Sequence, residues 1–365
     1  MATMDGVDDM GEAPTAPPGI DVAPVTDWLI ANIEGVAAPF TFELIAGGRS
    51  NLTYRVTDAT GRRLVLRRPP LSHVLASAHD MGREHRIISA LRDTPVPVPT
   101  ALGMCTDTYV NGAPFYVMDF VEGSILTSPS LVDAKFDEAA RRTIAEDLVD
   151  VMVEIHAVDI DAVGLGDLAR REGYIARQLK RWSGQFEASQ QQQRDTGIEV
   201  SDYGLPATYE LLAARIPEQG PAAIAHADYR IDNTMIGDDA HVAAVLDWEL
   251  CTLGDPLADV GAFIMYWHDP HHPQPVVDTF SVTSMPGFPT REELIARYAE
   301  RSGRDLSSLP YYLAFAHWRM ACIMDGVRAR FAAGAMGDAE SDADADLVTS
   351  ITTAADRAAA ALADL

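Results

Sequence analysis

The apolar pattern of the chain changes near Gly123, and this change limits the folds that the chain can adopt. Between about Phe40 and Val121, short apolar runs are separated by glycine and proline turns, as expected of strands, with one helical pattern over 77–91. Over 136–158, apolar residues recur at spacings of three and four, as on the buried face of a long helix. A small strand-rich part followed by a larger helical part predicts an α+β fold with two lobes.

The boundaries of these lobes follow from the same patterns. Residues 1–24 are rich in proline, glycine, alanine and acidic residues and lack apolar periodicity, which predicts a disordered acidic tail. We therefore expect a first lobe over 25–122 and a helical second lobe over 123–365.

Composition excludes several classes of function. The 365 residues include 28 Lys and Arg against 54 Asp and Glu, a formal net charge of −26. Such a chain lacks the basic surface that nucleic acids or anionic membranes attract. The three cysteines, Cys105, Cys251 and Cys322, form no close pair, and the acidic N-terminus has no signal-peptide pattern. We therefore expect a reduced, cytoplasmic protein, and the sequence leaves its oligomeric state open.

The most informative motif begins at His226 and reads H-x-D-x-x-x-x-N, with Asp228 and Asn233 at its polar positions. An apolar run over 243–246 follows, and Asp247 comes directly after it. Phosphoryl transfer from ATP needs an acid that accepts the proton of the attacking hydroxyl, together with oxygen ligands for Mg²⁺. Asp228 fits the first role, and Asn233 and Asp247 supply oxygens that Mg²⁺ prefers. Any one of these residues alone would more simply shape a loop or end a strand.

With these two motifs in order, the chain resembles the aminoglycoside phosphotransferase and choline kinase-like families, relatives of the protein kinases. Within that superfamily it is most similar to the kinase-like domain that is fused to some acyl-CoA dehydrogenases. The resemblance covers roughly residues 40–330. It implies a bilobal protein-kinase-like fold, with ATP and Mg²⁺ as cofactors and ATP bound in the cleft between the lobes.

The resemblance also implies roles for a turn between the first two predicted strands. In kinase-like proteins, backbone N–H groups of this turn cover the ATP phosphates. The corresponding residues here are Gly47, Gly48, Arg49, Ser50 and Asn51. Taken without the other motifs, a glycine pair between strands is more often only a hairpin turn.

The next predicted strand departs from the family pattern. It carries Arg67, followed by Arg68, where the family has its phosphate-binding lysine. Arginine keeps the charge but differs in shape and hydration. The resemblance implies that Glu84, on the following helix, pairs with Arg67; a solvated surface pair is the alternative. Strand alternation places Arg68 on the opposite face, so we expect Arg68→Ala to be nearly silent.

The segment over 115–123 resembles the connection that binds adenine in this superfamily. The resemblance implies that Met118 is the gatekeeper, that the Asp119 carbonyl meets the adenine amine and that the Val121 amide meets a ring nitrogen. An ordinary edge strand that enters a turn would have the same sequence pattern.

Three other polar segments have structural explanations. Asp255 and Asp259 are expected to cap the following helix and to hold the catalytic loop. The histidine-rich segment over 268–273 favours a surface loop over a metal site. The glutamine tract over 190–193 predicts a solvated helix end or loop.

Together these features predict an ATP- and Mg²⁺-dependent phosphotransferase that acts on a hydroxyl group of a small molecule. The acceptor is aminoglycoside-like or, by the nearer resemblance, a hydroxyacyl or lipid-derived metabolite. The alternative is a nucleotide-binding pseudokinase that serves as a regulatory module, which the missing lysine favours. A plain interaction protein would leave the ordered motifs unexplained.

Overall fold

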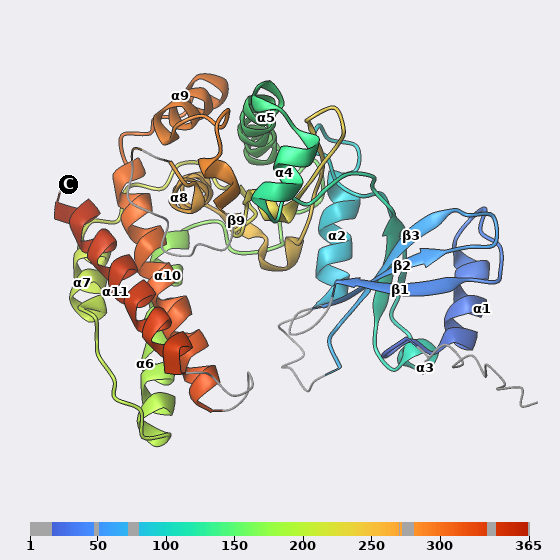
Figure 1. Cartoon of the computed structure of the whole chain (residues 1–365), viewed down its shortest axis with the longest axis horizontal. Coiled ribbons are helices and arrows are strands. Elements are labelled where there is room, and N and C mark those ends of the chain that lie inside the picture. Colours follow the sequence, from blue (N-terminus) through green and yellow to red (C-terminus); the bar gives the residue numbers. More distant parts are fainter. Residues whose placement is uncertain are drawn as a thin grey trace, which may run out of the picture. The chain divides into compact units, whose positions relative to one another are not determined.

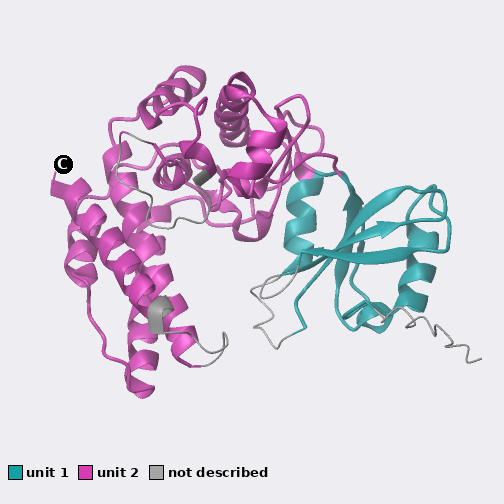
Figure 2. Cartoon of the chain, viewed as in Figure 1, with its two compact units in different colours: residues 1–89, 99–120 teal, residues 90–98, 121–365 magenta. Residues whose placement is uncertain are grey.

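In the computed structural model the chain divides into two compact units, which Figure 2 shows in different colours. Unit 1 comprises residues 1–89 and 99–120, and unit 2 comprises residues 90–98 and 121–365. The structure describes residues 17–46, 51–71, 80–269, 271, 281–333 and 341–363.

Unit 1 is built on a five-stranded antiparallel sheet with the strand order β1-β2-β3-β5-β4 (Figure 1). The strands are β1 (Thr41–Ala46), β2 (Leu52–Thr57), β3 (Arg63–Arg68), β4 (Ala101–Cys105) and β5 (Phe115–Asp119). Its helices are α1 (Val22–Asn32), α2 (Met81–Leu91) and the short α3 (Thr108–Asn111). Helix α1 therefore begins within the segment that the sequence predicts to be a disordered tail.

The predicted hairpin is present as β2 and β3. Its turn is closed by a hydrogen bond from the Gly61 amide to the Asp58 carbonyl at 3.0 Å. The buried Asp58 carboxylate accepts further hydrogen bonds from the amides of Ala37, Thr60 and Arg62. An Asp that bonds the backbone ahead of it favours a tight turn, and Gly61 adopts the positive φ that such a turn requires.

The two faces of β3 contact different helices. Leu64 and Leu66 are completely buried and share a core with Val25 and Leu29 of α1. Because side chains alternate along a strand, Arg67 lies on the other face, where it meets α2. This alternation decides which of the two neighbouring arginines can approach Glu84.

Unit 2 is largely helical. Its first helices are α4 (Pro129–Lys135), α5 (Glu138–Ala157), α6 (Tyr174–Asp195) and α7 (Leu205–Ala214). Two two-stranded antiparallel pairs follow, formed by β6 (Ala223–Ala225) with β9 (Thr252–Gly254) and by β7 (Thr234–Ile236) with β8 (Val242–Val245). The later helices are α8 (Pro256–Tyr266), α9 (Arg291–Ser302), α10 (Leu309–Ala332) and α11 (Ser341–Ala363). Short 3₁₀ turns occur at η1 (Ile231–Asn233), η2 (Trp248–Leu250) and η3 (Ser281–Ser284).

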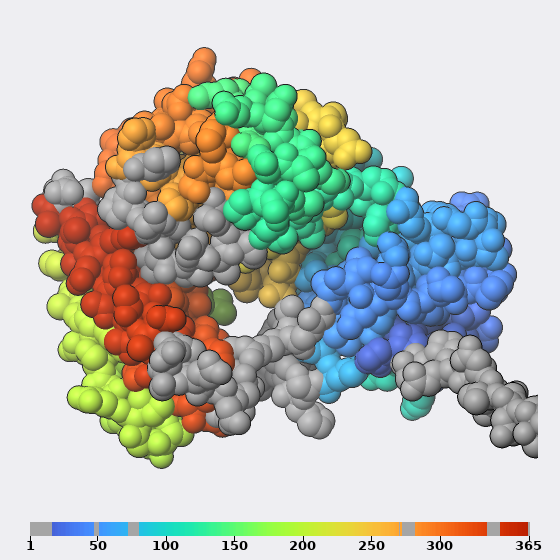
Figure 3. All heavy atoms as spheres, in the orientation of Figure 1, coloured from blue at the N-terminus to red at the C-terminus, as the bar shows by residue number. Residues whose placement is uncertain are grey.

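Helix α10 forms the centre of the helical packing in unit 2. It contacts α6, α7, α8 and α11, and most of its side chains are buried. In the space-filling view, the red atoms of α11 lie directly beside the yellow-green segment that includes α7 (Figure 3). None of the helices in the described ranges is both long enough and apolar enough to cross a membrane.

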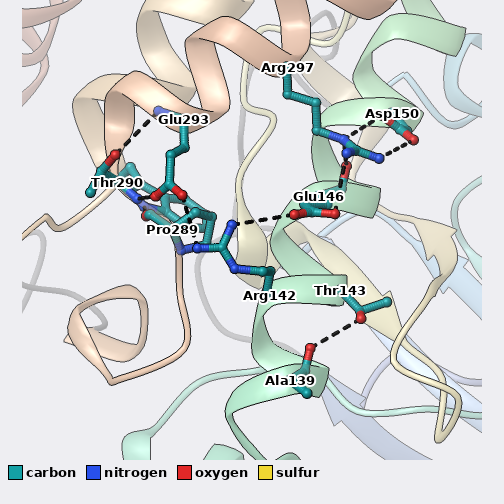
Figure 4. Close-up of polar contacts among 10 residues, drawn as sticks. Ala139, Arg142, Thr143, Glu146, Asp150, Pro289, Thr290, Glu293 and Arg297 are labelled. Atoms are coloured by element: carbon teal, nitrogen blue, oxygen red, sulfur yellow. Dashed lines mark hydrogen bonds and ion pairs between the residues drawn. The ribbon is translucent and has the colours of Figure 1, made fainter.

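Helix α9 begins and ends as its sequence predicts. Thr290 and Glu293 form a complete capping box, and Gly303 ends the helix with a φ of 65°. Charged side chains then join α9 to α5 (Figure 4). Arg142 bonds Glu293 at 2.9 Å, and Arg297 bonds Asp150 at 2.8 Å. Exposed or part-exposed pairs of this kind contribute little to stability one by one.

The glutamine tract lies at a helix end, as predicted, with Gln191 and Gln192 exposed, but the prediction of a solvated position is wrong for Gln190 and Gln193. Helix α6 continues through it to Asp195, and Gln190 and Gln193 are buried rather than solvated. Both side-chain amides donate to the buried Asp325 carboxylate of α10 at 2.9 Å. Hydrogen bonds to this charged partner offset the free-energy cost of burying the two amides. The sequence around the glutamines does not reveal Asp325, because it lies on another helix.

We expect the buried His317 of α10 to make the protein less stable in mild acid. Burial, helped by Arg357 and Arg291, lowers the pKa of His317 from 6.5 to about 3. Unfolding then adds a proton, so stability is lost as pH falls below 6.5 and continues to fall towards 3. Between pH 6.5 and pH 5 the loss is about 2 kcal/mol. Urea unfolding of the wild type and of His317→Gln checks this; parallel pH dependences would contradict it.

Candidate functional site

The residues of the predicted catalytic motif meet at one end of the β7–β8 pair in unit 2. The Asp228 carboxylate accepts a hydrogen bond from the Asn233 side-chain amide at 2.8 Å. Its other oxygen lies 3.4 Å from the Arg230 guanidinium. The Asp228 side chain is nevertheless 24% exposed, so it is held in place while it stays accessible to a substrate.

The strand pairing brings Asn233 and Asp247 to the same place. Thr234, which follows Asn233, pairs with Val245, and the Leu246 amide bonds the Asn233 carbonyl at 2.9 Å. Asp247 is the next residue, so it and Asn233 lie at the same end of the two strands. The spacing of the two motifs in sequence becomes proximity because β7 and β8 are antiparallel neighbours.

His226 connects the loop that carries Asp228 to the strand that ends at Asp247. Its Nδ1 accepts from the Asp228 amide at 3.3 Å, so a neutral ring carries its proton on Nε2, which lies 2.9 Å from the Leu246 carbonyl. The ring is completely buried. These contacts agree with a supporting role for His226 and leave no reason to make it a proton acceptor.

Two of the four described non-glycine residues with a positive φ lie at or beside the two acids. Ala227, directly before Asp228, has a φ of 67°, and Asp247 has a φ of 61°. Residues other than glycine rarely adopt this left-handed conformation, and it persists where the surrounding contacts enforce it, often at functional sites. At Ala227 the enforcing contact is visible, since the Asp259 carboxylate accepts from the amides of His226 and Ala227 at 2.6 and 2.9 Å.

Asp259 and Asp255 have the structural roles that the sequence predicts. Asp255 caps α8 by accepting from the Leu257 amide, and it also accepts from the Tyr312 hydroxyl at 2.6 Å. Burial acts to raise the pKa of Asp259, but hydrogen bonding and attraction from His156, with the loop amides, outweigh it and the pKa is lowered. Asp259 therefore stays charged and holds the catalytic loop.

The donor atoms at this end of β7 and β8 suit a magnesium ion. Because the Asn233 amide nitrogen is used by Asp228, its side-chain oxygen remains available. Asp247 adds a carboxylate, and two oxygen ligands supplemented by water and substrate phosphate are typical of Mg²⁺ sites. Across the described ranges, no group of three or more His, Cys, Asp or Glu side chains could hold a metal.

In unit 1 the structure contains the predicted pair of Arg67 and Glu84. The Arg67 Nε lies 3.1 Å from a Glu84 carboxylate oxygen, and these side chains are only 13% and 3% exposed. A solvated surface pair is therefore excluded. Pairing fixes the direction of the guanidinium, and its contact with phosphate stays a prediction.

The surroundings of Arg68 argue against the expectation that Arg68→Ala is silent. Arg68 is on the opposite face, as alternation requires, but it is buried and donates to the carbonyls of Gly19, Pro69 and Asn111. Removing it would leave these carbonyls unpaired and would lower stability. Alternation gives the direction of the side chain but does not show that a helix N-terminus covers that face.

The remaining predicted nucleotide contacts are only partly described. Gly47, Gly48, Arg49 and Ser50 lie outside the described residues, whereas Asn51 is described and buried. Met118 lies buried on β5 beside Val65, and Asp119 ends that strand. The contacts of the Asp119 carbonyl and the Val121 amide with adenine stay predictions.

The histidine-rich segment is only partly a surface loop. His268 is buried, with its amide bonded to the Thr283 hydroxyl at 2.8 Å, while His271 is exposed. His272 lies outside the described residues. The prediction of a surface position is therefore wrong for His268.

Sequence patterns did not predict three side chains that lie around Asp228. Arg230 lies over the Tyr266 ring at 5.1 Å, and Arg319 donates to the Ala227 carbonyl at 3.0 Å. Arg230 is within the motif but has no role assigned by spacing. Tyr266 and Arg319 are distant in sequence, so only the packing of α8 and α10 brings them here.

Comparison with known proteins identifies the same family as the sequence motifs. Residues 41–294 match the model of the phosphotransferase enzyme family. The chain belongs to this family. The mouse protein acyl-CoA dehydrogenase family member 10 is 36% identical over 312 residues, which cover 83% of the chain. They make up 28% of the mouse protein, so the chain spans less than a third of that relative.

Solved structures of this phosphotransferase family share the fold. A Ralstonia eutropha protein assigned to the aminoglycoside phosphotransferases superposes with a TM-score of 0.78 at 30% identity, over 94% of this chain and 98% of that one. A second structure, of aminoglycoside phosphotransferase APH(4)-Ia with AMP-PNP and hygromycin B, has a TM-score of 0.55 at 16% identity and covers 93% and 98% of the two chains. The phosphotransferase therefore has a kinase-like fold, with a small antiparallel sheet and a larger helical part.

We expect Arg67→Ala to reduce kcat/KM for ATP by about tenfold to a hundredfold. The change removes the cation that we expect to bind the ATP phosphates and that Glu84 orients. Arg67→Lys should retain part of the activity, since the charge survives without the planar fork. Glu84→Gln should cause a similar loss, and the double variant should lose less than the sum. Steady-state kinetics on folded variants checks this. If Arg67→Ala has wild-type kcat/KM, the assignment is wrong.

Proposed function

We propose that the chain is an ATP- and Mg²⁺-dependent kinase of a small molecule that carries a hydroxyl group. The observation that carries this proposal is the arrangement of Asp228, Asn233 and Asp247 at one end of β7 and β8. Family membership supports phosphoryl transfer, and the fold is shared with a protein that was solved with AMP-PNP and hygromycin B.

In this proposal Asp228 accepts the proton of the acceptor hydroxyl. As the hydroxyl oxygen bonds to the γ-phosphorus of ATP, the bond from that phosphorus to the β–γ bridging oxygen breaks and ADP leaves. The Asn233 amide and the Arg230 guanidinium hold the Asp228 carboxylate on two sides. Fixing a general base in this way lowers the cost of orienting it in the transition state.

Asn233 and Asp247 would hold Mg²⁺, which neutralises charge on the phosphates when it is bound. We assign Arg67 with Glu84 and the backbone of Asp119 to ATP, and by the family resemblance the Val121 amide as well. His226 and Asp259 position the loop and do not touch substrate. We also propose a reduced compartment such as the cytoplasm, because all three cysteines are buried and free.

The pseudokinase alternative is favoured by Arg67 at the position of the usual lysine. Its buried ion pair with Glu84 keeps a positive charge at that position, which supports an active enzyme. A regulatory module would also have no need for an accessible carboxylate at Asp228.

A screen of hydroxylated metabolites and aminoglycosides for acceptor-dependent release of ADP tests the proposal. We expect at least one class to accelerate ADP release in the presence of Mg²⁺ and not in its absence. Mg²⁺-dependent ATP binding without turnover on any class would favour the pseudokinase.

A further inference from the structure

Positive charge gathers beside Asp228, although the chain as a whole carries a net charge of −26. The nearer cation, Arg230, is already neutralised. Its guanidinium lies 3.4 Å from Asp228 and 3.2 Å from Asp232. A ligand therefore meets little net charge at Arg230.

Arg319 reaches the same loop from α10. One terminal nitrogen donates to the Ala227 carbonyl at 3.0 Å, directly before Asp228. Within the described ranges the contacts of Arg319 are this hydrogen bond and the Trp182 ring, with no carboxylate among them, and its buried Nε has no hydrogen-bond partner. A guanidinium has five N–H donors and stays charged at all relevant pH values. Because the Nε is buried and one terminal nitrogen bonds Ala227, the other terminal nitrogen of Arg319 is the one left for another group.

An aromatic ring lies beside this guanidinium, and a tyrosine lies within its electrostatic influence. The Trp182 ring of α6 lies 5.4 Å from Arg319, within cation–π range, and α6 and α10 pack against each other (Figure 1). Burial raises the pKa of the Tyr266 phenol to about 12, and Asp228 acts in the same direction. Arg319 acts to lower the same pKa, so the Tyr266 phenol lies close enough to Asp228 and to Arg319 for both charges to affect it. The general base and the uncompensated cation thus share one partly buried region.

The arginines of α6 add to this positive region. Burial raises the pKa of the Tyr174 phenol to about 12, and Arg319, Arg181 and Arg177 all act to lower it. Arg177 donates only to backbone carbonyls, of Arg170 and Glu172. No described carboxylate pairs with Arg177 or Arg181, so this side of the region remains positive.

We propose that the acceptor carries an anionic group, a carboxylate or a phosphate, which binds Arg319 while the acceptor hydroxyl faces Asp228. The proposal rests on the proposed kinase function, and it narrows the acceptor to hydroxylated anions. A polycationic aminoglycoside would place its ammonium groups against Arg319 and the arginines of α6. Like charges in a partly buried site repel strongly, so such an acceptor is disfavoured.

Binding measurements on the full chain with Mg²⁺ and AMP-PNP test this without turnover. The probes share one carbon chain with a hydroxyl at one end and differ only at the other end: a carboxylate, a phosphate monoester, a neutral amide or an amine. We expect the carboxylate or the phosphate to bind at least about tenfold more tightly than the amide, and the amine to bind most weakly. Comparing the two anionic probes identifies which anion the site takes.

Arg319→Gln should bind the anionic probes no more tightly than the amide probe, and its Kd for AMP-PNP should be unchanged. Arg319→Lys should restore part of it, because the charge survives. Arg215→Gln is the matched control. Arg215 also bonds a backbone carbonyl, that of Leu362 in α11, but it lies at the end of α7 and has no place in the proposed site. The Arg215→Gln variant should have the same ratios of Kd among the four probes as the wild type.

Three results would overturn the proposal: tighter binding of the amide or the amine, binding of none of the four probes, or an equal loss for every probe and for AMP-PNP in Arg319→Gln. The last result would mean that Arg319 only supports the loop. Failure of the kinase function would look different, as selective binding of the anion without any ADP release. Turnover of an amine probe would have the reverse meaning, an active kinase with a different acceptor.

Discussion

Asp228→Asn is expected to lower kcat by about two to four orders of magnitude while the Kd of Mg²⁺-ATP stays close to that of the wild type. Asparagine keeps the shape of the side chain and can still accept a hydrogen bond from Asn233, but it cannot take a proton from the acceptor. Because Asp228 is held by Asn233 and Arg230 and is 24% exposed, the change removes the base without removing a buried core contact.

Asp232→Asn is the matched control for this variant. Asp232 lies on the same loop and its carboxylate also pairs with Arg230, at 3.2 Å. If the two acids served only to neutralise Arg230, both variants would lose similar activity. We expect the loss for Asp232→Asn to be far smaller, and equal losses would show that Asp228 is not the base.

Asp247→Asn should instead weaken the binding of Mg²⁺-ATP, by at least about tenfold, and reduce turnover with it. Asparagine is the substitution of choice because Asp247 has a φ of 61°, which asparagine tolerates better than alanine. The neutral amide is a poorer ligand for Mg²⁺ than the carboxylate. Calorimetric titration of ATP at several Mg²⁺ concentrations measures the effect.

The contrast between Asp228→Asn and Asp247→Asn is the informative part of these two predictions. A ligand of the metal acts on nucleotide binding, whereas a base that faces the acceptor acts on the chemical step. Equal loss of Mg²⁺-ATP affinity in both variants would show that the two roles are assigned wrongly.

The parts of the fold and site that could be predicted depend on local patterns. Alternation along β3 separates Arg67 from Arg68, and the spacing of Asp228 and Asn233 follows from one short loop. The capping box of α9 is similarly local, since Thr290 and Glu293, three positions apart, contain the whole signal. In each case the physical cause lies within a few residues of its effect.

The parts that could not be predicted depend on partners distant in sequence. Gln193 is buried because Asp325, 132 residues later, accepts its hydrogen bond. Arg68 is buried because the N-terminal end of α1 covers its face of the sheet, and its nitrogen bonds the Gly19 carbonyl. Arg319 reaches the catalytic loop from 92 residues away. A single sequence contains no periodic or spacing signal for such contacts.

The central claim is that this chain transfers the γ-phosphate of ATP to a hydroxyl with Asp228 as the base. Phosphorus NMR of the wild type and Asp228→Asn, each with ATP, Mg²⁺ and the best acceptor, tests it most directly. We predict a phosphate-ester signal that grows as the γ-phosphate signal declines in the wild type, and a rate lower by about two to four orders of magnitude in Asp228→Asn. Undiminished ester formation by Asp228→Asn, or ATP bound by the wild type without any ester, would contradict the claim.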